Sequence, residues 1–589
     1  MSHRPWTRGP GLFLFVLLAL VSMAATNSAV DTEVYTLAGK VTDASGTPIG
    51  GATVSAFTDG GAHNVTVYSQ PDGTFEIGGL PGESYEVRAR LIGYSDALTD
   101  AGQVSADNSG LALTLKKASA AELQLQRPGN NLLDMLTWSD EKDALNFKMM
   151  CTYCHQVGTL GFRSPEEPVD WEVMLTRMDG FQGLYQHTQD ALVDKIVSVY
   201  GREAEAEWPD FEPPAPPTGA ATEGKVWEWT MGVENGSMIH DLELGADGKV
   251  YTVDMVQDAI VTLDPMTGER TTHPIPGGKE YGSDEPPIKG PHSLEMDTEG
   301  HMWVTLALSG EMGFFDTNKN EWRVVSGHVA PRPRSGYPHT LRIDEKGWVW
   351  WTDAALGVFS LDPKTYDAEN NRYDVKYYKL PSKDQVQGGG ARGESRGITP
   401  YGIDIAPNGH IWYGKLNGQR IGRIIPELAD DDPKKIMEWK PPVHGPRRMH
   451  VAPNGLVWVP GWASGDIASF DPVTEEWAVY QLPKGPNSLP YALNIEPETG
   501  HVWVCGTGTD SLLRFDPENK TFTEYNLPTR VTYTRELEFD DEGHVWTVNS
   551  NWPTRHIENG MGSVIRLSPK HTELTPPTPV SEIVAGGGR

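Results

Sequence analysis

The feature that most constrains the fold is a repeat that runs from residue 224 to residue 570. A turn glycine is followed three residues later by an aromatic residue, and successive repeats lie 43 to 62 residues apart. The seven pairs are Gly248/Tyr251, Gly300/Trp303, Gly347/Trp350, Gly409/Trp412, Gly455/Trp458, Gly500/Trp503 and Gly543/Trp546. A period of this size, holding about four short strands, is typical of a β-propeller blade. The repeat therefore predicts a seven-bladed β-propeller over residues 224–570.

The two ends of the repeat predict how such a ring would close. Residues 225–229 look like an outermost strand that has no blade of its own, and the last repeat ends at residues 564–567 without an outermost strand. We therefore expect the first strand to complete the last blade. The chain as a whole is predicted to be a mainly β, multidomain protein.

The N-terminal part of the chain predicts export followed by a small β-sandwich. Residues 1–24 carry Arg4, Arg8 and an apolar run over 12–21, which is typical of a secretory signal peptide; a retained anchor is the alternative. Strands of period two then recur over residues 33–117, separated by glycine turns. This segment resembles the carboxypeptidase regulatory-like domain, a transthyretin-like sandwich, and the resemblance implies a structural or docking role without catalysis.

Charge and hydropathy limit where the protein works and what it binds. No later stretch is apolar for long enough to span a bilayer, so the mature chain is predicted to be periplasmic or secreted in a bacterium. The formal net charge of -31 argues against nucleic acid and anionic membranes as partners. The acidic surface provides solubility or a docking face for a basic redox partner.

A helical segment, residues 130–205, carries a Cys-x-x-Cys-His motif at residues 151–155. Two thiols at this spacing attach haem c covalently, so Cys151 and Cys154 are predicted to bind the porphyrin and His155 to ligate the iron. Cys505 is then the one remaining cysteine, and no internal disulfide is expected. The proline-rich residues 206–223 that follow are predicted to be a semi-stiff linker.

The second axial ligand of that haem is predicted from residues 171–178. This segment resembles the tryptophan-to-methionine helix of small class I cytochromes c, and the resemblance implies a cytochrome c domain over residues 130–205 with Met178 on the iron. Met174 lies one turn earlier on the same helix face and is an alternative. His187 is a third candidate, which would lower the potential relative to a thioether ligand.

A constant offset from each turn glycine predicts which side chains face the central channel. Counting eight residues back, with one extra residue in the sixth repeat, gives one position per blade at a common level. These positions hold His240, His292, His339, Tyr401, Arg447, Tyr491 and Arg535. Converging imidazoles suit a channel metal on His240, His292 and His339, while the two arginines suit a carboxylate.

The propeller repeats also resemble the streptogramin (virginiamycin B) lyase family in turn, aromatic and Phe-Asp-Pro strand. That family is implied to open a lactone by elimination, using magnesium with a histidine and a glutamate fourteen residues apart. His339/Asp353 and His240/Asp254 reproduce the spacing with aspartate in place of glutamate. The candidate catalytic residues are therefore His339, Asp353, His240, Asp254, Tyr401, Arg447, Tyr491 and Arg535.

Together these patterns predict an exported haem c-linked oxidoreductase. Substrate or a second cofactor, a metal or a carboxylated quinone, would bind in the channel, and the haem would pass electrons to a soluble periplasmic acceptor such as a cytochrome. One alternative is a metal-dependent lyase or hydrolase with an accessory cytochrome. Another is a non-catalytic electron-transfer or binding protein.

Overall fold

The computed structural model describes residues 33–153, 155–157, 171–176, 189–201, 204, 208–326, 336–381, 400–551 and 557–569. The predicted signal peptide, residues 1–24, lies outside these ranges. Among the described residues, no helix has both the length and the apolar character that crossing a bilayer requires.

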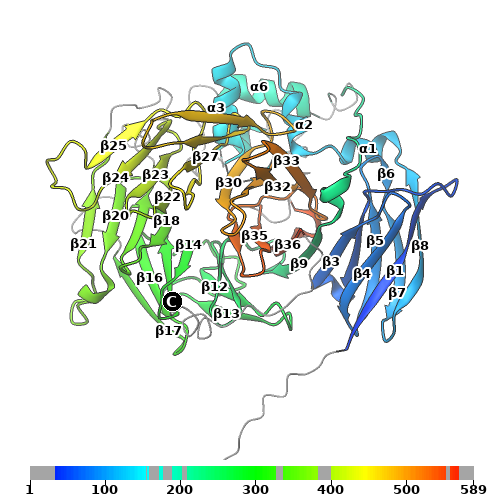
Figure 1. The fold of residues 1–589 in the computed structure, drawn as a ribbon, viewed down its shortest axis with the longest axis horizontal. Coiled ribbons are helices and arrows are strands. Elements are labelled where there is room, and N and C mark those ends of the chain that lie inside the picture. The colour runs from blue at the N-terminus through cyan, green and yellow to red at the C-terminus, as the bar shows by residue number, and fades with distance from the viewer. Residues whose placement is uncertain are drawn as a thin grey trace, which may run out of the picture.

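The N-terminal part is a β-sandwich, as predicted, and lies beside the ring of strands (Figure 1). Leu37, Ile77, Val54 and Val87 fill the space between its two sheets. One sheet has the order β4-β1-β8-β6, formed by Thr74–Pro81, Val34–Asp43, Asn108–Lys117 and Tyr94–Ser95. The other has the order β3-β2-β5-β7, formed by His63–Tyr68, Thr53–Thr58, Ser84–Arg90 and Ala97–Gln103, with the short helix η1 (Asp59–Gly61) after β2.

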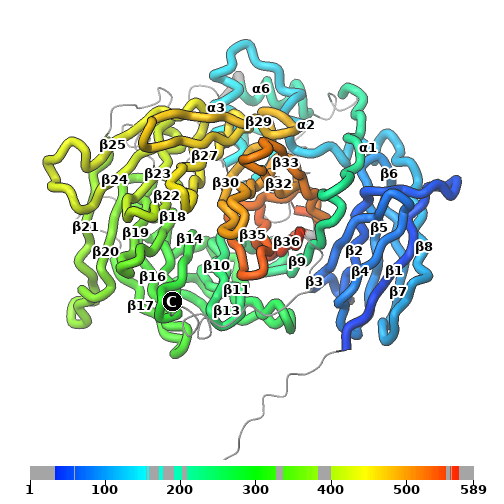
Figure 2. Tube along the Cα trace, in the orientation of Figure 1, coloured from blue at the N-terminus to red at the C-terminus, as the bar shows by residue number. Residues whose placement is uncertain are grey.

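The C-terminal part is a ring of four-stranded antiparallel sheets with a propeller-like fold (Figure 2). The first three sheets are β10–β13 (Ile239–Leu244, Val250–Asp254, Ala259–Leu263, Arg270–Pro274), β14–β17 (Pro291–Met296, Met302–Leu306, Glu311–Asp316, Glu321–Ser326) and β18–β21 (Pro338–Ile343, Val349–Asp353, Gly357–Leu361, Val375–Tyr378). The next three are β22–β25 (Pro400–Ile405, Ile411–Lys415, Arg420–Ile424, Ile436–Trp439), β26–β29 (His450–Val451, Val457–Gly461, Asp466–Phe470, Trp477–Gln481) and β30–β33 (Pro490–Ile495, Val502–Gly506, Ser511–Asp516, Thr521–Asn526). Short helices η4 (Pro363–Thr365) and η6 (Glu558–Gly560) lie in the connections.

The repeated turn explains why these sheets share one geometry. All seven turn glycines have a positive φ, from 71° to 85°, which favours glycine because it has no Cβ. In three repeats an aspartate before the turn also accepts a hydrogen bond from the repeat's tryptophan; the Asp344 Oδ2 to Trp350 Nε1 distance is 3.0 Å. The glycine and the aromatic residue thus fix the hairpin between the first two strands of a sheet.

The last sheet closes the ring and also joins it to the sandwich. Its strands are β34 (Glu538–Phe539), β35 (Val545–Asn549), β36 (Gly562–Ser568) and β9 (Lys225–Met231). The pairing of β9 with β36 confirms that the first strand completes the last sheet. The other edge of β9 pairs with β3, which the sequence did not predict, and the result is one eight-stranded sheet.

The helical segment packs on the ring near β27 and β30, at the top of Figure 1. Its named helices are α1 (Ala120–Leu125), α2 (Gly129–Asp134), α3 (Glu141–Cys151) and α6 (Gln189–Tyr200); residues 171–176 are also helical. Leu132, Phe147 and Ile196 share a hydrophobic cluster with Trp462 and Leu489 of the ring. The proline-rich segment leads through η3 (Gly219–Thr222) into β9.

Candidate functional site

The channel-facing positions predicted by the register form one connected group. We call His240, His292, His339, Tyr401, Arg447, Tyr491 and Arg535 the polar ring; all are at most 3% exposed. In five sheets the pairing of the first two strands shifts register at this level, as between Ile239 and Leu242 or Pro338 and Leu341. Such a bulge redirects a side chain, and the repeated shift gives the ring residues a common placement.

Three imidazoles and one phenol of the polar ring lie in order, each tilted against the next. Ring centroids are 3.7 Å apart for His240 and His292, 3.9 Å for His292 and His339, and 3.9 Å for His339 and Tyr401. We call His240, His292 and His339 the histidine arc. Its members lie on β10, β14 and β18, which are neighbouring inner strands.

Neighbouring side chains fix two of the three imidazoles. His240 Nδ1 lies 2.9 Å from Asp241 Oδ1, and His339 Nδ1 lies 2.9 Å from Thr340 Oγ1. Burial lowers the pKa of His240 to about 3, and burial also lowers the pKa of His292 and His339 well below the ordinary value. The arc is therefore neutral at pH 7, which is the form of imidazole that binds a metal or accepts a proton.

Tyrosines and arginines form the other side of the polar ring. The Tyr401 and Tyr491 hydroxyl oxygens are 2.7 Å apart, Arg447 Nη2 donates to Tyr401 Oη at 2.8 Å, and Arg535 Nη1 donates to Tyr491 Oη at 3.3 Å. Burial opposes ionisation of Tyr491, but the charges of Arg447 and Arg535 outweigh it and lower the pKa of this phenol. Tyr491 is thus the phenol of the ring best suited to give up its proton.

The Cys-x-x-Cys-His motif lies directly against this group. We call residues 151–157 the motif loop; Cys154 lies outside the described residues, as do Met178 and His187. The carbonyl oxygen of Tyr153 accepts hydrogen bonds from Arg447 Nη2 at 2.9 Å and from Tyr533 Oη at 2.6 Å. The Tyr153 ring also contacts Tyr401, with centroids 6.0 Å apart.

A second contact holds the end of the motif loop in the ring. The Gln156 side-chain amide donates to Asp510 Oδ1 at 2.7 Å and to the carbonyl oxygens of Thr507 and Thr532, while the Gln156 backbone N–H donates to Asn551 Oδ1 at 3.2 Å. These bonds cross more than 350 residues of sequence. The loop is therefore built into the ring and does not merely lie on its surface.

The described residues of the motif loop include two of the three that the motif predicts to hold haem, Cys151 and His155. Cys151 ends helix α3 and is a free thiol, as is Cys505. His155 is buried, and its Nδ1 lies 2.9 Å from the carbonyl oxygen of Gln156. Because a carbonyl oxygen can only accept, Nδ1 carries the proton and Nε2 is the ring nitrogen with the lone pair. Burial lowers the pKa of His155, which keeps the ring neutral. Met174, the alternative distal ligand, lies half-buried in the helix over 171–176.

The two aspartates predicted from the lyase spacing accept hydrogen bonds from nearby backbone N–H groups. Asp254 Oδ1 accepts backbone N–H groups of Met238 and Gln257 at 3.0 and 3.2 Å. Asp353 Oδ1 accepts the N–H of Ala355 at 2.9 Å. In register, Asp254 stands opposite Ile239 and Asp353 opposite Pro338. The carboxylate beside His240 is Asp241, which the spacing argument did not select.

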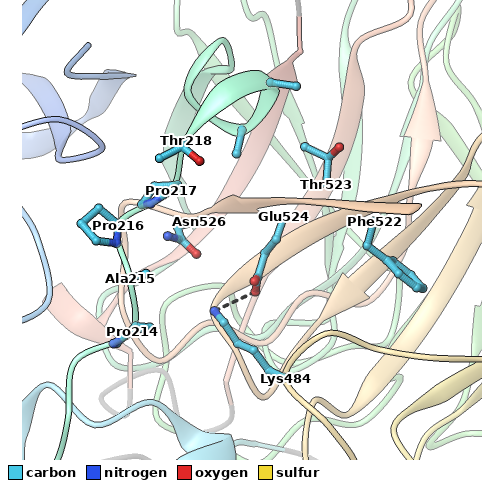
Figure 3. Close-up of a pocket in the computed structure, with 12 residues that line it drawn as sticks. Pro214, Ala215, Pro216, Pro217, Thr218, Lys484, Phe522, Thr523, Glu524 and Asn526 are labelled. Carbon is cyan, nitrogen blue, oxygen red and sulfur yellow. Dashed lines mark ion pairs between the residues drawn. The ribbon is translucent and has the colours of Figure 1, made fainter. Parts of the chain in front are cut away.

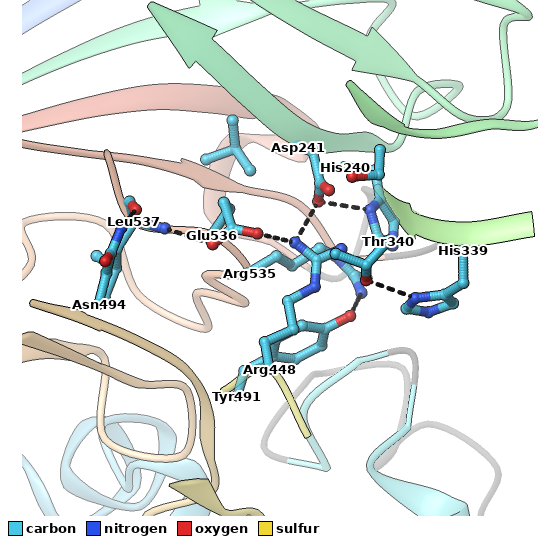
Figure 4. Close-up of polar contacts among 12 residues, drawn as sticks. His240, Asp241, His339, Thr340, Arg448, Tyr491, Asn494, Arg535, Glu536 and Leu537 are labelled. Atoms are coloured by element: carbon cyan, nitrogen blue, oxygen red, sulfur yellow. Dashed lines mark hydrogen bonds and ion pairs between the residues drawn. The ribbon is translucent and has the colours of Figure 1, made fainter. Parts of the chain in front are cut away.

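Asp241 belongs to a charged group whose contacts are drawn in Figure 4. Arg448 Nη1 lies 2.8 Å from Asp241 Oδ1 and 2.5 Å from Glu536 Oε2, and we call these three residues the carboxylate bridge. Each directly follows a member of the polar ring. The sequence does contain a signal for this group. The residue that follows the polar-ring position is charged in three repeats, after His240, Arg447 and Arg535, and is small and uncharged in the other four.

A second level of charged residues lies three positions beyond the polar ring. Glu243, Glu295 and Glu538 occupy neighbouring inner strands there. Burial and the neighbouring carboxylates raise the pKa of Glu538 to about 8, and burial raises the pKa of Glu295 to about 7. These groups therefore hold protons near neutral pH, and sequence reasoning missed them.

A surface pocket of roughly 310 Å³ lies elsewhere, between the proline-rich segment and β33 (Figure 3). Pro216, Thr218 and Asn526 line it, and an ion pair of 2.8 Å joins Lys484 to Glu524 at its edge. None of the predicted site residues borders this pocket.

Comparison with known proteins gives a family for the N-terminal part and similar folds for the rest. No curated protein matches the chain. The solved structures similar to it include virginiamycin B lyase from Staphylococcus aureus (17% identity, 59% of this chain and 99% of that one, TM-score 0.46) and a streptogramin B lyase (18%, 60% and 100%, TM-score 0.46). Another is the extracellular domain of a putative one component system from B. thetaiotaomicron (15%, 58% and 42%, TM-score 0.42). Residues 36–116 match the family of the carboxypeptidase regulatory-like domain, and this segment is such a domain.

Proposed function

We propose that the chain is an exported, haem c-containing oxidoreductase of the bacterial periplasm. In this proposal the ring is a seven-bladed propeller, its channel site binds substrate or a second cofactor, and the haem of residues 130–205 passes electrons to a soluble acceptor. The observation that carries the proposal is the contact between the motif loop and the polar ring, through the carbonyl oxygen of Tyr153.

That contact makes the path from the motif to the histidine arc short. Arg447 binds both Tyr153 and Tyr401, and the Tyr401 ring contacts His339 with centroids 3.9 Å apart. Electron transfer requires the two centres to be close, and only two side chains separate the motif backbone from the arc. A haem far from the ring would have favoured an accessory cytochrome.

When bound through Cys151 and Cys154, haem c supplies one-electron redox chemistry. The residues of this chain hold it: His155 presents a neutral imidazole, and Met178 is proposed as the second axial ligand, with Met174 and His187 as alternatives. The polar ring positions the reacting partner, since Tyr491 can take up or release a proton at Oη and Arg447 fixes the motif loop. Burial of every ring residue keeps bulk water away from that proton.

The chain's charge supports the proposed acceptor. A formal net charge of -31 attracts a basic soluble carrier such as a small cytochrome and accelerates its encounter at low ionic strength. We expect the rate of electron exchange with a basic cytochrome c to fall steeply as salt is added, because the Debye length shortens.

The proposal is tested by expressing the full chain in a bacterium that matures c-type cytochromes and measuring covalent haem on a denaturing gel and in the optical spectrum. One haem per chain is expected, Cys151→Ala should abolish covalent attachment, and the matched control Cys505→Ala should retain it. Electron exchange with a basic cytochrome c is then measured by stopped flow. A chain without covalent haem, or a haem that does not exchange electrons, would overturn the proposal.

A further inference from the structure

Two histidines and a carboxylate in the channel meet the geometric requirement for a metal site. One ligand atom each from His240, Asp241 and His292 lie within 4.8 Å of one another. All three residues are buried, and they come from the adjacent inner strands β10 and β14. The fold places them there because His240 and His292 occupy the same register position in successive repeats.

An unpartnered nitrogen points independently to a ligand at this place. His292 Nδ1 is buried without a hydrogen-bond partner, and its ring is held between those of His240 and His339. His339 Nε2, next along the arc, also lacks a hydrogen-bond partner. Buried polar atoms in native proteins are nearly always satisfied, so an orphaned imidazole nitrogen beside a carboxylate calls for an electron-pair acceptor.

The surrounding contacts orient the donors for a cation. Asp241 Oδ1 lies 2.9 Å from His240 Nδ1, so an ion bound by both atoms would take the place of the proton that they share. Arg448 holds Asp241 in place and also pairs with Glu536 at 2.5 Å, and Glu536 in turn lies 3.7 Å from Arg342. Imidazole and carboxylate donors together suit divalent first-row transition metals.

We propose that His240, Asp241 and His292 bind one divalent transition-metal ion, with Fe(II) the best match for two histidines and one carboxylate. This inference deepens the proposed function by identifying the second cofactor. Metal binding itself requires no haem. The two proposals can therefore fail separately.

Metal binding by the full haem-loaded chain tests the inference. After chelator treatment the protein is titrated with Zn(II) as a probe that haem iron does not obscure, and then with Fe(II), and the bound metal is counted by mass spectrometry. We expect one non-haem ion per chain and at least tenfold weaker binding in His292→Gln and Asp241→Asn. His501→Gln, a histidine at a blade turn outside the channel, is the control and should bind like the wild type.

Two further readouts keep the result decisive. Covalent haem and its reducibility are measured in the same samples, so loss of the haem is distinguished from loss of the metal site. If a variant does not fold, X-ray absorption at the zinc edge of the loaded wild type must still show imidazole nitrogen in the ligand shell. A wild-type chain that binds no stoichiometric metal, a His292→Gln variant that binds normally, or a zinc shell without imidazole would overturn the inference.

Discussion

At the scale of single residues, Arg447 joins the motif loop to the polar ring. Its guanidinium donates to Tyr153 and Tyr401 and lies 3.6 Å from the centroid of the Tyr491 ring and 4.2 Å from that of Trp462. A desolvated cation over aromatic faces contributes on the order of 2 kcal/mol. From the sequence we expected the guanidinium of Arg447 to face a bound carboxylate. In the structure its N–H groups bind Tyr153 and Tyr401 instead, so Arg447 fixes the motif loop.

The hydroxyl of Tyr533 is the second tie to the motif loop, and its removal is a direct test of docking. It donates to the carbonyl oxygens of Thr152 and Tyr153 at 2.8 and 2.6 Å. Tyr533→Phe leaves buried acceptors with fewer donors, which costs roughly 1–3 kcal/mol of unfolding free energy in urea titrations. Hydrogen exchange over residues 130–157 should also accelerate.

The control for this change is Tyr377→Phe, which removes a hydroxyl on the outer strand β21 that donates to the carbonyl oxygen of Leu356. It should lower stability without altering exchange over residues 130–157. Unchanged protection of that segment in Tyr533→Phe would show that the loop is held by other contacts.

A local period in the sequence is what allows single residues to be placed. His240 and Tyr401 could be placed because each inner strand begins a fixed distance before its turn glycine. Sequence reasoning missed the carboxylate bridge. Its contacts join residues that lie 88 to 207 positions apart in the sequence, and no local pattern predicts such a pairing. The docking of Tyr153 was unpredictable for the same reason.

At the scale of elements, strand β9 belongs to two units. It pairs with β36 on one edge and with β3 on the other, and Trp229 stands opposite Val564 and His63. The end of the repeat predicted the first pairing, since a sheet was left one strand short. The sequence of a strand does not indicate which strand of another domain will pair with its free edge. The pairing of β9 with β3 is therefore known only from the structure.

Trp229→Ala is expected to destabilise the ring and the sandwich together. The indole of Trp229 is 2% exposed and stacks on Trp546 with centroids 5.7 Å apart, inside the cluster that spans both units. Truncating a buried tryptophan costs about 3–5 kcal/mol. A guanidinium titration should show one transition, shifted to lower denaturant, for both parts of the chain.

Trp477→Ala is the matched control, because Trp477 is a half-buried residue on the outer strand β29 of a sheet remote from the sandwich. It should cost less and leave the sandwich unaffected. Two separate transitions in Trp229→Ala, with the sandwich at its wild-type midpoint, would contradict the shared role of β9.

At the scale of the whole molecule, both smaller parts are held to the ring by contacts that are distant in sequence. The helical segment is fixed through the motif loop, and the sandwich through β3 and a group of ions. In that group Arg90 on β5 binds Glu558, with Nη2 to Oε1 at 2.6 Å and Nη1 to Oε2 at 2.7 Å, and also binds Asp96. Bidentate pairing of this kind gives orientation as well as attraction, so the sandwich has one defined position on the ring.

Acidification should weaken that junction before it unfolds the ring. Burial opposes ionisation of Glu558, but hydrogen bonds and charge from Arg90 outweigh it and hold the pKa of this carboxyl at about 2, below its ordinary value of 4.5. Because the folded-state pKa is the lower one, the carboxylate stabilises the junction above pH 4.5, and this contribution is lost as pH falls from 4.5 through about 2. Unfolding midpoints measured between pH 7 and pH 2.5 should therefore fall more steeply for the wild type than for Glu558→Gln, which has no charge to lose. Glu299→Gln, at an exposed glutamate on a blade turn, should follow the wild-type curve; parallel curves for the wild type and Glu558→Gln would show that the charge of Glu558 does not hold the sandwich on the ring.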